Sequence, residues 1–357
     1  MGKLSNAENS KKQFGKPMID QYAPPYHITP GILHSIERIG EALGNLRAHS
    51  DSATFPLLRR GNRIKTIQAS LAIEGNTLSL EQVTAVIAGK RVLAPPREIQ
   101  EVRNAFAAYE ELPNWSTYSR KDLLAAHGIM MAGLVDEIGC FRSGKVGIQQ
   151  GEKIVHIAPP AKRVPALMDD LLAWLEKTDE HPLVASCVFH YEFEFIHPFQ
   201  DGNGRMGRLW QTLILSHWKL VFALLPVETI IRDRQQDYYA ALGQSDQTAD
   251  ATAFIEFMLG AILRAIEEAT NQTDQVSDQV SDQVIRLLRA LRKSPRSAFD
   301  LMKELGLAHR PTFRKNYLGP ALAAGLIEMT QPDTARAPNQ KYRLTARGNQ
   351  FIEKREG

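Results

Sequence analysis

The chain has 357 residues, of which 43% are hydrophobic and 23% charged, a composition typical of a soluble globular protein with two or three domains. The first residues lack the charged and apolar regions of a secretory signal, and the most apolar window, residues 209–227, is interrupted by polar residues, so we expect neither export nor a membrane span. Cys140 and Cys187 are isolated and lack CxxC spacing, so we expect reduced thiols and a cytoplasmic location.

The net charge of +3 conceals an asymmetry along the chain. Residues 1–282 carry 28 Lys or Arg against 34 Asp or Glu, which gives −6, whereas residues 283–357 carry 15 against 6, which gives +9. A basic tail behind a mildly acidic body suggests two separate functions in one chain.

Hydrophobic residues recur at helical spacing through most of the body, after a polar, proline-bearing arm at residues 1–30. This periodicity predicts helices at residues 32–43, 62–73, 80–88, 98–112, 122–133, 167–175, 182–196, 205–220 and 255–266. Residues 145–157 differ, because two apolar runs flank the tetrapeptide Gln-Gln-Gly-Glu, a pattern that predicts a short β-hairpin.

A four-residue repeat, Asp-Gln-Val-Ser, fills residues 274–284. Its polar composition favours a solvated linker. The alternative is a helix that continues from the body, because Val276, Val280 and Val284 would share one helical face.

The basic tail has the pattern of a helix-turn-helix followed by two strands. Helices are predicted at residues 297–305 and 311–324, and strands at residues 326–329 and 342–344 flank a loop rich in Pro and Asn. This order is similar to that of a winged-helix module. Arg310, Arg314 and Lys315 would begin its second helix, where side chains that contact DNA belong. Dimerisation or the docking of protein targets is the competing interpretation.

The most informative stretch of the chain runs from His197 to Arg208, with the sequence His-Pro-Phe-Gln-Asp-Gly-Asn-Gly-Arg-Met-Gly-Arg. Gly202, Asn203 and Gly204 precede the predicted helix at 205–220, so backbone N–H groups and the helix N-terminus can point at one anion. Arg205 and Arg208 lie three residues apart on one helical face, from which both can bind phosphate oxygens.

The same stretch carries a base and a carboxylate. An imidazole is a base suited to neutral pH, so His197 can accept a proton from a hydroxyl group. Asp201 cannot cage a divalent ion alone, but one carboxylate with phosphate oxygens and waters is a usual arrangement for Mg²⁺. The stretch therefore predicts a site for a nucleotide triphosphate and its metal ion.

Other interpretations of these residues are weaker. Asn203-Gly204 is also a hairpin-turn signal, but the preceding segment has helical rather than alternating periodicity. An EF-hand is disfavoured because Arg205 stands where an oxygen ligand belongs. The chain has no Walker sequence and no HExxH motif, and isolated histidines such as His127 and His190 are interpreted as structural.

Residues 197–208 resemble the HPFx[D/E]GNGRxxR signature of Fic-domain proteins, with every fixed position filled. The resemblance covers roughly residues 30–270 and implies transfer of AMP from ATP to protein hydroxyl groups. By it, His197 is the base, Asp201 the Mg²⁺ ligand, Gly202–Gly204 the α-phosphate site, and Arg205 and Arg208 ligands of the β- and γ-phosphates. It also implies that the 145–157 hairpin is a flap that docks targets by strand addition, and that Tyr238 and Tyr239 lie near the adenine.

A second motif, residues 70–76, resembles the inhibitory motif of the same family. It comprises Ser70, Glu74, Gly75 and Asn76, and lies N-terminal to the catalytic stretch. By this resemblance, Glu74 pairs with Arg208 and occupies the place of the γ-phosphate.

The sequence therefore predicts a mainly α protein with a Fic-type helical core, a β-hairpin flap and a C-terminal α+β winged-helix domain. The expected parts are an arm at 1–30, a helical region at 31–120 with the inhibitory motif, a catalytic core at 121–272, a linker at 273–284 and the winged helix at 285–357. Expected partners are ATP, target proteins or the chain itself, a possible homodimer, and DNA at residues 285–357. Three alternative functions stay open: removal of AMP from modified proteins, DNA-binding regulation with the body as a sensor, and use of another nucleotide or a phosphocholine donor.

Overall fold

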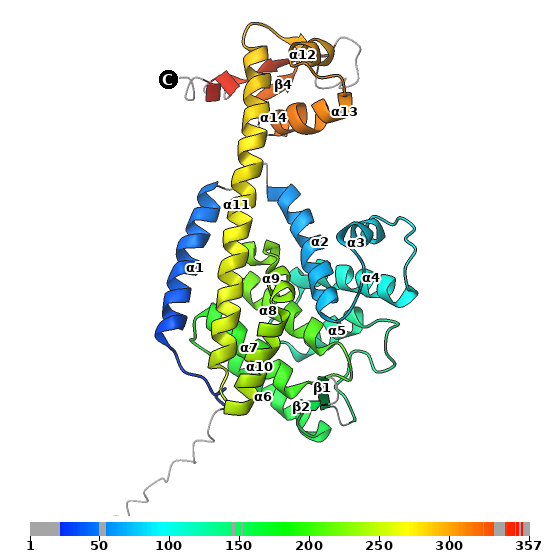
Figure 1. Cartoon of the computed structure of the whole chain (residues 1–357), viewed down its shortest axis with the longest axis vertical. Helices are drawn as coiled ribbons and strands as arrows, with labels where there is room; N and C mark the ends of the chain where they lie inside the picture. Colours follow the sequence, from blue (N-terminus) through cyan, green and yellow to red (C-terminus); the bar gives the residue numbers. More distant parts are fainter. Residues whose placement is uncertain are drawn as a thin grey trace, which may run out of the picture.

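The computed structural model describes residues 22–49, 55–144, 147–150, 153–323, 325–331, 340–346, 348–349 and 351–352. Helices build almost all of the body, and a small group of helices and strands lies at the far end of the long helix α11 (Figure 1). None of the described helices combines the length and the apolar character needed to cross a membrane.

Eleven α-helices occur in the described part of the chain up to residue 291. They are α1 (Pro30–His49), α2 (Phe55–Ile73), α3 (Leu80–Ile87), α4 (Pro96–Glu111), α5 (Arg120–Met130), α6 (Val164–Lys177), α7 (Pro182–Ile196), α8 (Asn203–Trp218), α9 (Val227–Asp233), α10 (Gln235–Thr248) and α11 (Thr252–Leu291). Three short 3₁₀ turns occur in the same part: η1 (Leu112–Asn114) and η3 (Leu220–Leu224) lie between helices, and η2 (Ala161–Arg163) lies between β2 and α6.

Helix α7 lies at the centre of the body, and thirteen of its fifteen residues are buried. Val184 and Val188 belong to one hydrophobic cluster, with residues of α1, α9, α10 and α11. Phe189 and Phe193 belong to a second cluster, with residues of α2 to α6 and α8. A helix that is apolar on all sides belongs in a core, and α7 thus fixes the position of the loop that follows it.

The predicted helices of the body are all present. Most ends differ by a few residues, but the helix predicted at 255–266 continues to Leu291 as α11. Helices α9 and α10 were not predicted. Helix α9 has only seven residues, and α10 is polar, with Tyr238, Ala241 and Ser245 as its buried residues. Neither therefore shows a long apolar stripe in the sequence.

The predicted hairpin is present as strands β1 (Gly147–Gln150) and β2 (Lys153–Ile157). The strands pair antiparallel, with a bulge between Ile148 and Gln149. The use of this hairpin as a docking flap stays a prediction.

The repeat at 274–284 lies within α11, a single helix of 40 residues. The helical alternative is therefore the one that the structure adopts, since the backbone is not an irregular linker there. Val284 is buried against residues that follow it in the chain.

The residues after α11 form a small separate core. It comprises β3 (Arg296–Ser297), α12 (Ala298–Glu304), α13 (Arg310–Phe313), the π-helical turn η4 (Arg314–Leu318), α14 (Gly319–Ala323), β4 (Ile327–Met329) and β5 (Lys341–Leu344). The three strands form an antiparallel sheet in the order β3-β5-β4. The predicted helices and the two predicted strands are present, β3 is an additional strand, and the winged-helix assignment stays a prediction. Arg310, Arg314 and Lys315 are exposed at the start of the second helical segment.

The described cores fall on either side of the repeat. The two body clusters contain no residue after Ala269, and the tail cluster contains none before Val284. We therefore expect a chain that ends at residue 282 to keep the fold of the body. A chain that ends at residue 297 should instead aggregate, because Leu287, Leu288 and Leu291 lose the tail residues that bury them. Thermal unfolding and light scattering of the two truncated chains check this, and loss of the folded body in the shorter chain would contradict it.

Candidate active site

The loop from α7 to α8 is held in an unusual backbone conformation. His197 ends α7 in the left-handed region, with φ of 50°, and Gly202 precedes α8 with φ of 85°. A left-handed conformation is common for glycine but costs free energy at a histidine, so the surroundings must hold His197 in place.

The side chain of Asn203 closes the loop on itself. Its Nδ2 donates to the carbonyl of Phe199 at 2.9 Å, and its Oδ1 accepts from the Phe199 N–H at 2.8 Å. The side-chain amide of Asn203 thus holds the shape of the loop. The backbone of Asn203 begins α8, and the first N–H groups of a helix have no partner within the helix.

Arg142 fastens the His197 end of the loop. Its Nε donates to the His197 carbonyl at 2.7 Å, its Nη2 to the Ile196 carbonyl at 3.3 Å, and the backbone N–H of Arg142 to Pro198 at 2.9 Å. Arg142 is 3% exposed, and burial lowers the pKa of its guanidinium. The carbonyl at the end of α7 is therefore satisfied by a buried cation, which suits the negative end of a helix dipole.

His127 supports the middle of the loop from α5. Its ring stacks on Phe199, with the ring centroids 3.7 Å apart. Nδ1 accepts from the Gly139 N–H at 3.0 Å, so Nε2 carries the proton and donates to the Asp201 carbonyl at 3.1 Å. His127 is fully buried with both ring nitrogens used, which confirms its structural interpretation.

Arg208 is the buried cation of the site, with 2% of its surface exposed. Its Nη2 donates to Glu74 Oε1 at 2.7 Å and to the Ser70 carbonyl at 3.0 Å, and its Nε donates to Ser70 Oγ at 3.1 Å. Burial lowers the pKa of Arg208, but Glu74, Tyr238 and Glu194 together outweigh burial, and the pKa lies above its ordinary value. Glu74 and Ser70 therefore meet Arg208, across more than 130 residues of sequence.

The Glu74 carboxylate also covers the first turn of α8. A Cβ added to Gly204 would collide with Glu74 Oε1 and would lie 3.0 Å from Arg208 Nη1. An anion of the protein itself thus occupies the helix N-terminus, the position where a phosphate group is expected.

Asp201 is surrounded by cationic and N–H donors. Its Oδ1 accepts from the Gly202 N–H at 2.6 Å and from Arg205 Nη2 at 3.1 Å, and its Oδ2 lies 3.4 Å from Arg97 Nη2. The carboxylate is 42% exposed. No three His, Cys, Asp or Glu side chains gather as a metal cage in the described residues. A single accessible carboxylate fits Mg²⁺ that takes its other ligands from phosphates and water.

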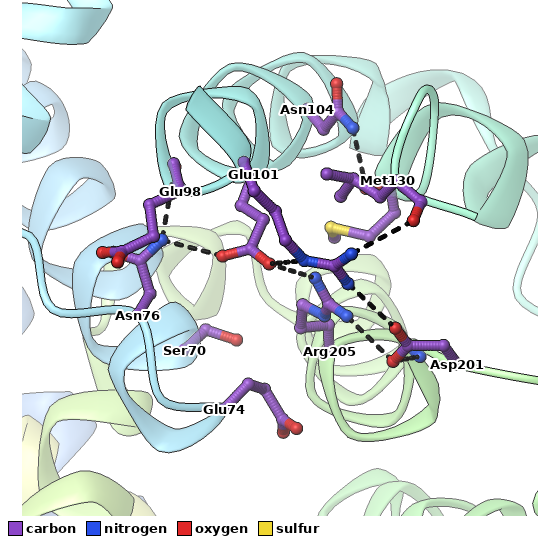
Figure 2. Close-up of polar contacts among 12 residues, drawn as sticks. Ser70, Glu74, Asn76, Glu98, Glu101, Asn104, Met130, Asp201 and Arg205 are labelled. Atoms are coloured by element: carbon purple, nitrogen blue, oxygen red, sulfur yellow. Dashed lines mark hydrogen bonds and ion pairs between the residues drawn. The ribbon is translucent and has the colours of Figure 1, made fainter. Parts of the chain in front are cut away.

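A chain of polar contacts joins Asp201 to the second motif (Figure 2). Arg205 lies 3.6 Å from Glu101 on α4, and Glu101 accepts from Asn76 Nδ2 at 2.8 Å. Asn76 also bonds the Glu98 carbonyl at 3.2 Å. The last residue of this motif, Asn76, is thus connected to the phosphate loop through α4.

Glu194 and His190 form a buried polar pair on α7, beneath α8. Glu194 Oε1 lies 3.7 Å from His190 Nε2, which is 3.2 Å from the hydroxyl of Tyr238. Burial raises the pKa of Glu194, but His190, His197 and Arg208 outweigh burial and hold the pKa below its ordinary value.

The two tyrosines of α10 differ in burial, because Tyr238 is a core residue whereas Tyr239 is 40% exposed. A contact of either tyrosine with adenine stays a prediction.

The structure brings the residues of the catalytic stretch together with Ser70 and Glu74. Sequence reasoning missed several residues that hold them, namely Arg97, Glu101, Arg142 and Glu194. Glu194 is three residues before His197 and could have been noted as a carboxylate in an apolar helix. The other three carry no local signal, because their partners lie in distant segments.

Gly207 has no room for a side chain. A Cβ there would lie 2.7 Å from Glu194 Oε1 and 2.9 Å from His190 Cδ2. We expect Gly207→Ala to lower the free energy of unfolding by about 1–3 kcal/mol, because both neighbours are packed in the core. Gly243→Ala on α10 is the matched control, since nothing lies within 4 Å of its added Cβ, and it should stabilise by up to about 1 kcal/mol. Denaturant unfolding of both variants measures the difference, and equal stability would contradict the packing argument.

The buried His127 should make the protein less stable in mild acid. Burial lowers the pKa of His127 in the folded state, so below its unfolded pKa, about 6.5, the unfolded chain binds the proton more readily. The stability contributed by the neutral ring is complete above that pH and is lost as the pH falls. We expect His127→Gln to flatten the pH dependence of unfolding between about pH 7 and 5, measured by urea titration at each pH. A parallel fall in wild type and variant would contradict this.

Comparison with known families agrees with the resemblance of residues 197–208 to the Fic signature. The family model described as "Fic/DOC family" matches residues 117–215, and the model "Filamentation induced by cAMP protein Fic-like, C-terminal domain" matches residues 282–345. A crystal structure of a Fic family protein from Desulfovibrio desulfuricans G20 is 62% identical, with a TM-score of 0.69, over 91% of this chain and 99% of that chain.

Two curated relatives carry an activity in their names. "Protein adenylyltransferase fic-1" of Caenorhabditis briggsae is 32% identical over 203 residues, which are 53% of this chain and 38% of the relative. "Protein adenylyltransferase Fic" of Nematostella vectensis is 30% identical over 204 residues, 54% of this chain and 45% of the relative. The chain thus matches less than half the length of these relatives.

Proposed function

The chain belongs to the Fic family, and from that premise we propose that it is an autoinhibited protein adenylyltransferase of the cytoplasm. It transfers AMP from ATP to a Tyr, Thr or Ser hydroxyl of target proteins or of itself. The observation that carries the proposal is the Glu74 carboxylate on Arg208 at the N-terminus of α8. The site already holds an anion between a buried arginine and a helix terminus, which are the groups that bind phosphate.

The reaction that these residues can perform is an in-line displacement at the α-phosphorus. The hydroxyl oxygen of the target forms the new bond to phosphorus, its proton passes to the His197 ring, and the bond to the β-phosphate breaks to release pyrophosphate. Positioning and charge neutralisation supply most of the catalysis in such a transfer. The backbone of Gly202–Gly204 binds the α-phosphate, and Arg205 and Arg208 bind the β- and γ-phosphates.

Glu194 assists the proton transfer electrostatically. It lies one helical turn before His197, and the charge of His197 contributes to the low pKa of its carboxyl group. Because electrostatic coupling is reciprocal, the Glu194 carboxylate stabilises the imidazolium that forms when His197 accepts the proton.

Asp201 would hold the Mg²⁺ ion, which neutralises charge on the phosphates when it is bound. Asp201 offers a hard oxygen ligand next to the phosphate-binding turn, as this ion prefers. Oδ2 is the oxygen to which the ion would bind, because Oδ1 is used by Gly202 and Arg205.

The partners follow from the remaining elements. The β1–β2 hairpin would dock an extended target segment by strand addition, and a homodimer stays an open prediction. The basic tail would bind DNA through Arg310, Arg314 and Lys315, which are exposed on one helical segment that has no acidic residue between Glu304 and Glu328.

Autoinhibition predicts that Glu74→Gly increases AMP transfer. Arg208 can bind one anion at close range, either the Glu74 carboxylate or the γ-phosphate. Because Glu74 belongs to the same chain, it competes with the γ-phosphate at a high effective concentration. We expect at least about tenfold more AMP incorporation, the lower part of the range for a close charge pair, because Glu74 is 34% exposed. Mass spectrometry of the protein and of a lysate, at equal ATP, measures the incorporation.

Three controls make this result specific. Glu74→Gln keeps the size of the side chain without its charge, so a gain in both variants assigns inhibition to charge. The double variant Glu74→Gly, His197→Ala should lose about 10²–10⁴-fold of the gained activity if His197 is the base. Release of AMP from a premodified protein by the wild type, without incorporation in any variant, would instead favour AMP removal as the function.

A further inference from the structure

Arg97 on α4 contacts the carboxylate of Asp201 from outside the catalytic stretch. Its Nη2 lies 3.4 Å from Asp201 Oδ2, its Nε lies 3.5 Å from Glu101 Oε1, and its Nη1 donates to the Leu134 carbonyl at 3.3 Å. Three contacts from three different segments orient one guanidinium toward the loop. Arg97 is outside the catalytic stretch, and the proposed reaction gives it no role.

The contacts of the two Asp201 oxygens differ in origin. Oδ1 is bonded by Gly202 and Arg205, which belong to the loop and to α8 and keep the carboxylate oriented. The contact of Oδ2 comes from another helix, and its length of 3.4 Å makes it the weaker one. Oδ2 is therefore the oxygen that a ligand can take with the least rearrangement.

A divalent cation and a guanidinium cannot share this oxygen at close range, because the two positive charges repel. Arg97 is 58% exposed, and an exposed ion pair of this kind contributes little stability. Arg97 is thus a competitor that can be displaced. Its contact with Glu101, four residues along the same helix, gives the displaced guanidinium a remaining partner.

We propose that Arg97 is a placeholder cation on Asp201, displaced when a divalent ion binds, and that it thereby sets the concentration of divalent ion that the site requires. In the absence of the ion it neutralises Asp201 beside a turn that must attract phosphate. This inference rests on the proposed role of Asp201 as the metal ligand.

The test is a Mn²⁺ titration followed by electron paramagnetic resonance, with the full-length chain and saturating ADP. ADP lacks the γ-phosphate whose place Glu74 is proposed to take. We expect Arg97→Gln to tighten Mn²⁺ binding by about threefold to fivefold, the factor that corresponds to loss of one exposed ion pair, whereas Arg97→Lys should stay near wild type. Arg38→Gln removes a comparable exposed pair with Glu267, between α1 and α11 and far from the site, and should change nothing.

The outcomes separate this inference from the proposed function. If Asp201→Asn binds Mn²⁺ as tightly as wild type, Asp201 is not the metal ligand, and both proposals about it are wrong. If Asp201→Asn weakens binding while Arg97→Gln leaves it unchanged, the metal assignment stands and the placeholder is refuted. Weaker Mn²⁺ binding by Arg97→Gln, together with weaker ADP binding in EDTA, would overturn the placeholder by showing that Arg97 binds phosphate.

Discussion

A buried arginine is the constraint on which the site depends. Arg208 is 2% exposed, and a cation removed from water in this way is costly unless an anion and hydrogen bonds replace the solvent. Ser70 supplies two acceptors and Glu74 supplies the anion. When no phosphate is bound, the protein itself must provide that anion. The buried charge of Arg208 therefore explains why α8 contacts the segment of Ser70 and Glu74, more than 130 residues away in the sequence.

The catalytic loop depends in turn on the burial of α7. Because two hydrophobic clusters pack on opposite sides of this helix, its end cannot shift without disturbing both. His197 can then be held in a left-handed conformation, whose cost is offset by the contacts of Arg142 on the neighbouring carbonyls. The packing of α7 thus fixes the position of His197, the residue that we propose as the base.

The local chemistry was predictable from the sequence and its surroundings were not. Twelve consecutive residues carry the base, the carboxylate, the turn and both arginines, and the pairing of Glu74 with Arg208 followed from a resemblance. Arg142 and Glu101 contact residues of this stretch only because the tertiary fold brings them together. No pattern in the sequence predicts these contacts. Helices α9 and α10 were not predicted for a related reason: packing of α9 against α2 and α11, and of α10 against α11, stabilises them, and neither has a long apolar stripe of its own.

The segment that carries Ser70, Glu74 and Asn76 is attached to the body by contacts other than the Glu74–Arg208 ion pair. Ile67 and Leu71 of α2 are buried in the core, and Asn76 is held by Glu101 and the Glu98 carbonyl on α4. These attachments do not involve Glu74, so they persist when its carboxylate leaves Arg208. Under the proposed autoinhibition, release therefore requires only a change of side-chain partner at Arg208, and neither unfolding of α2 nor its departure from the body is needed.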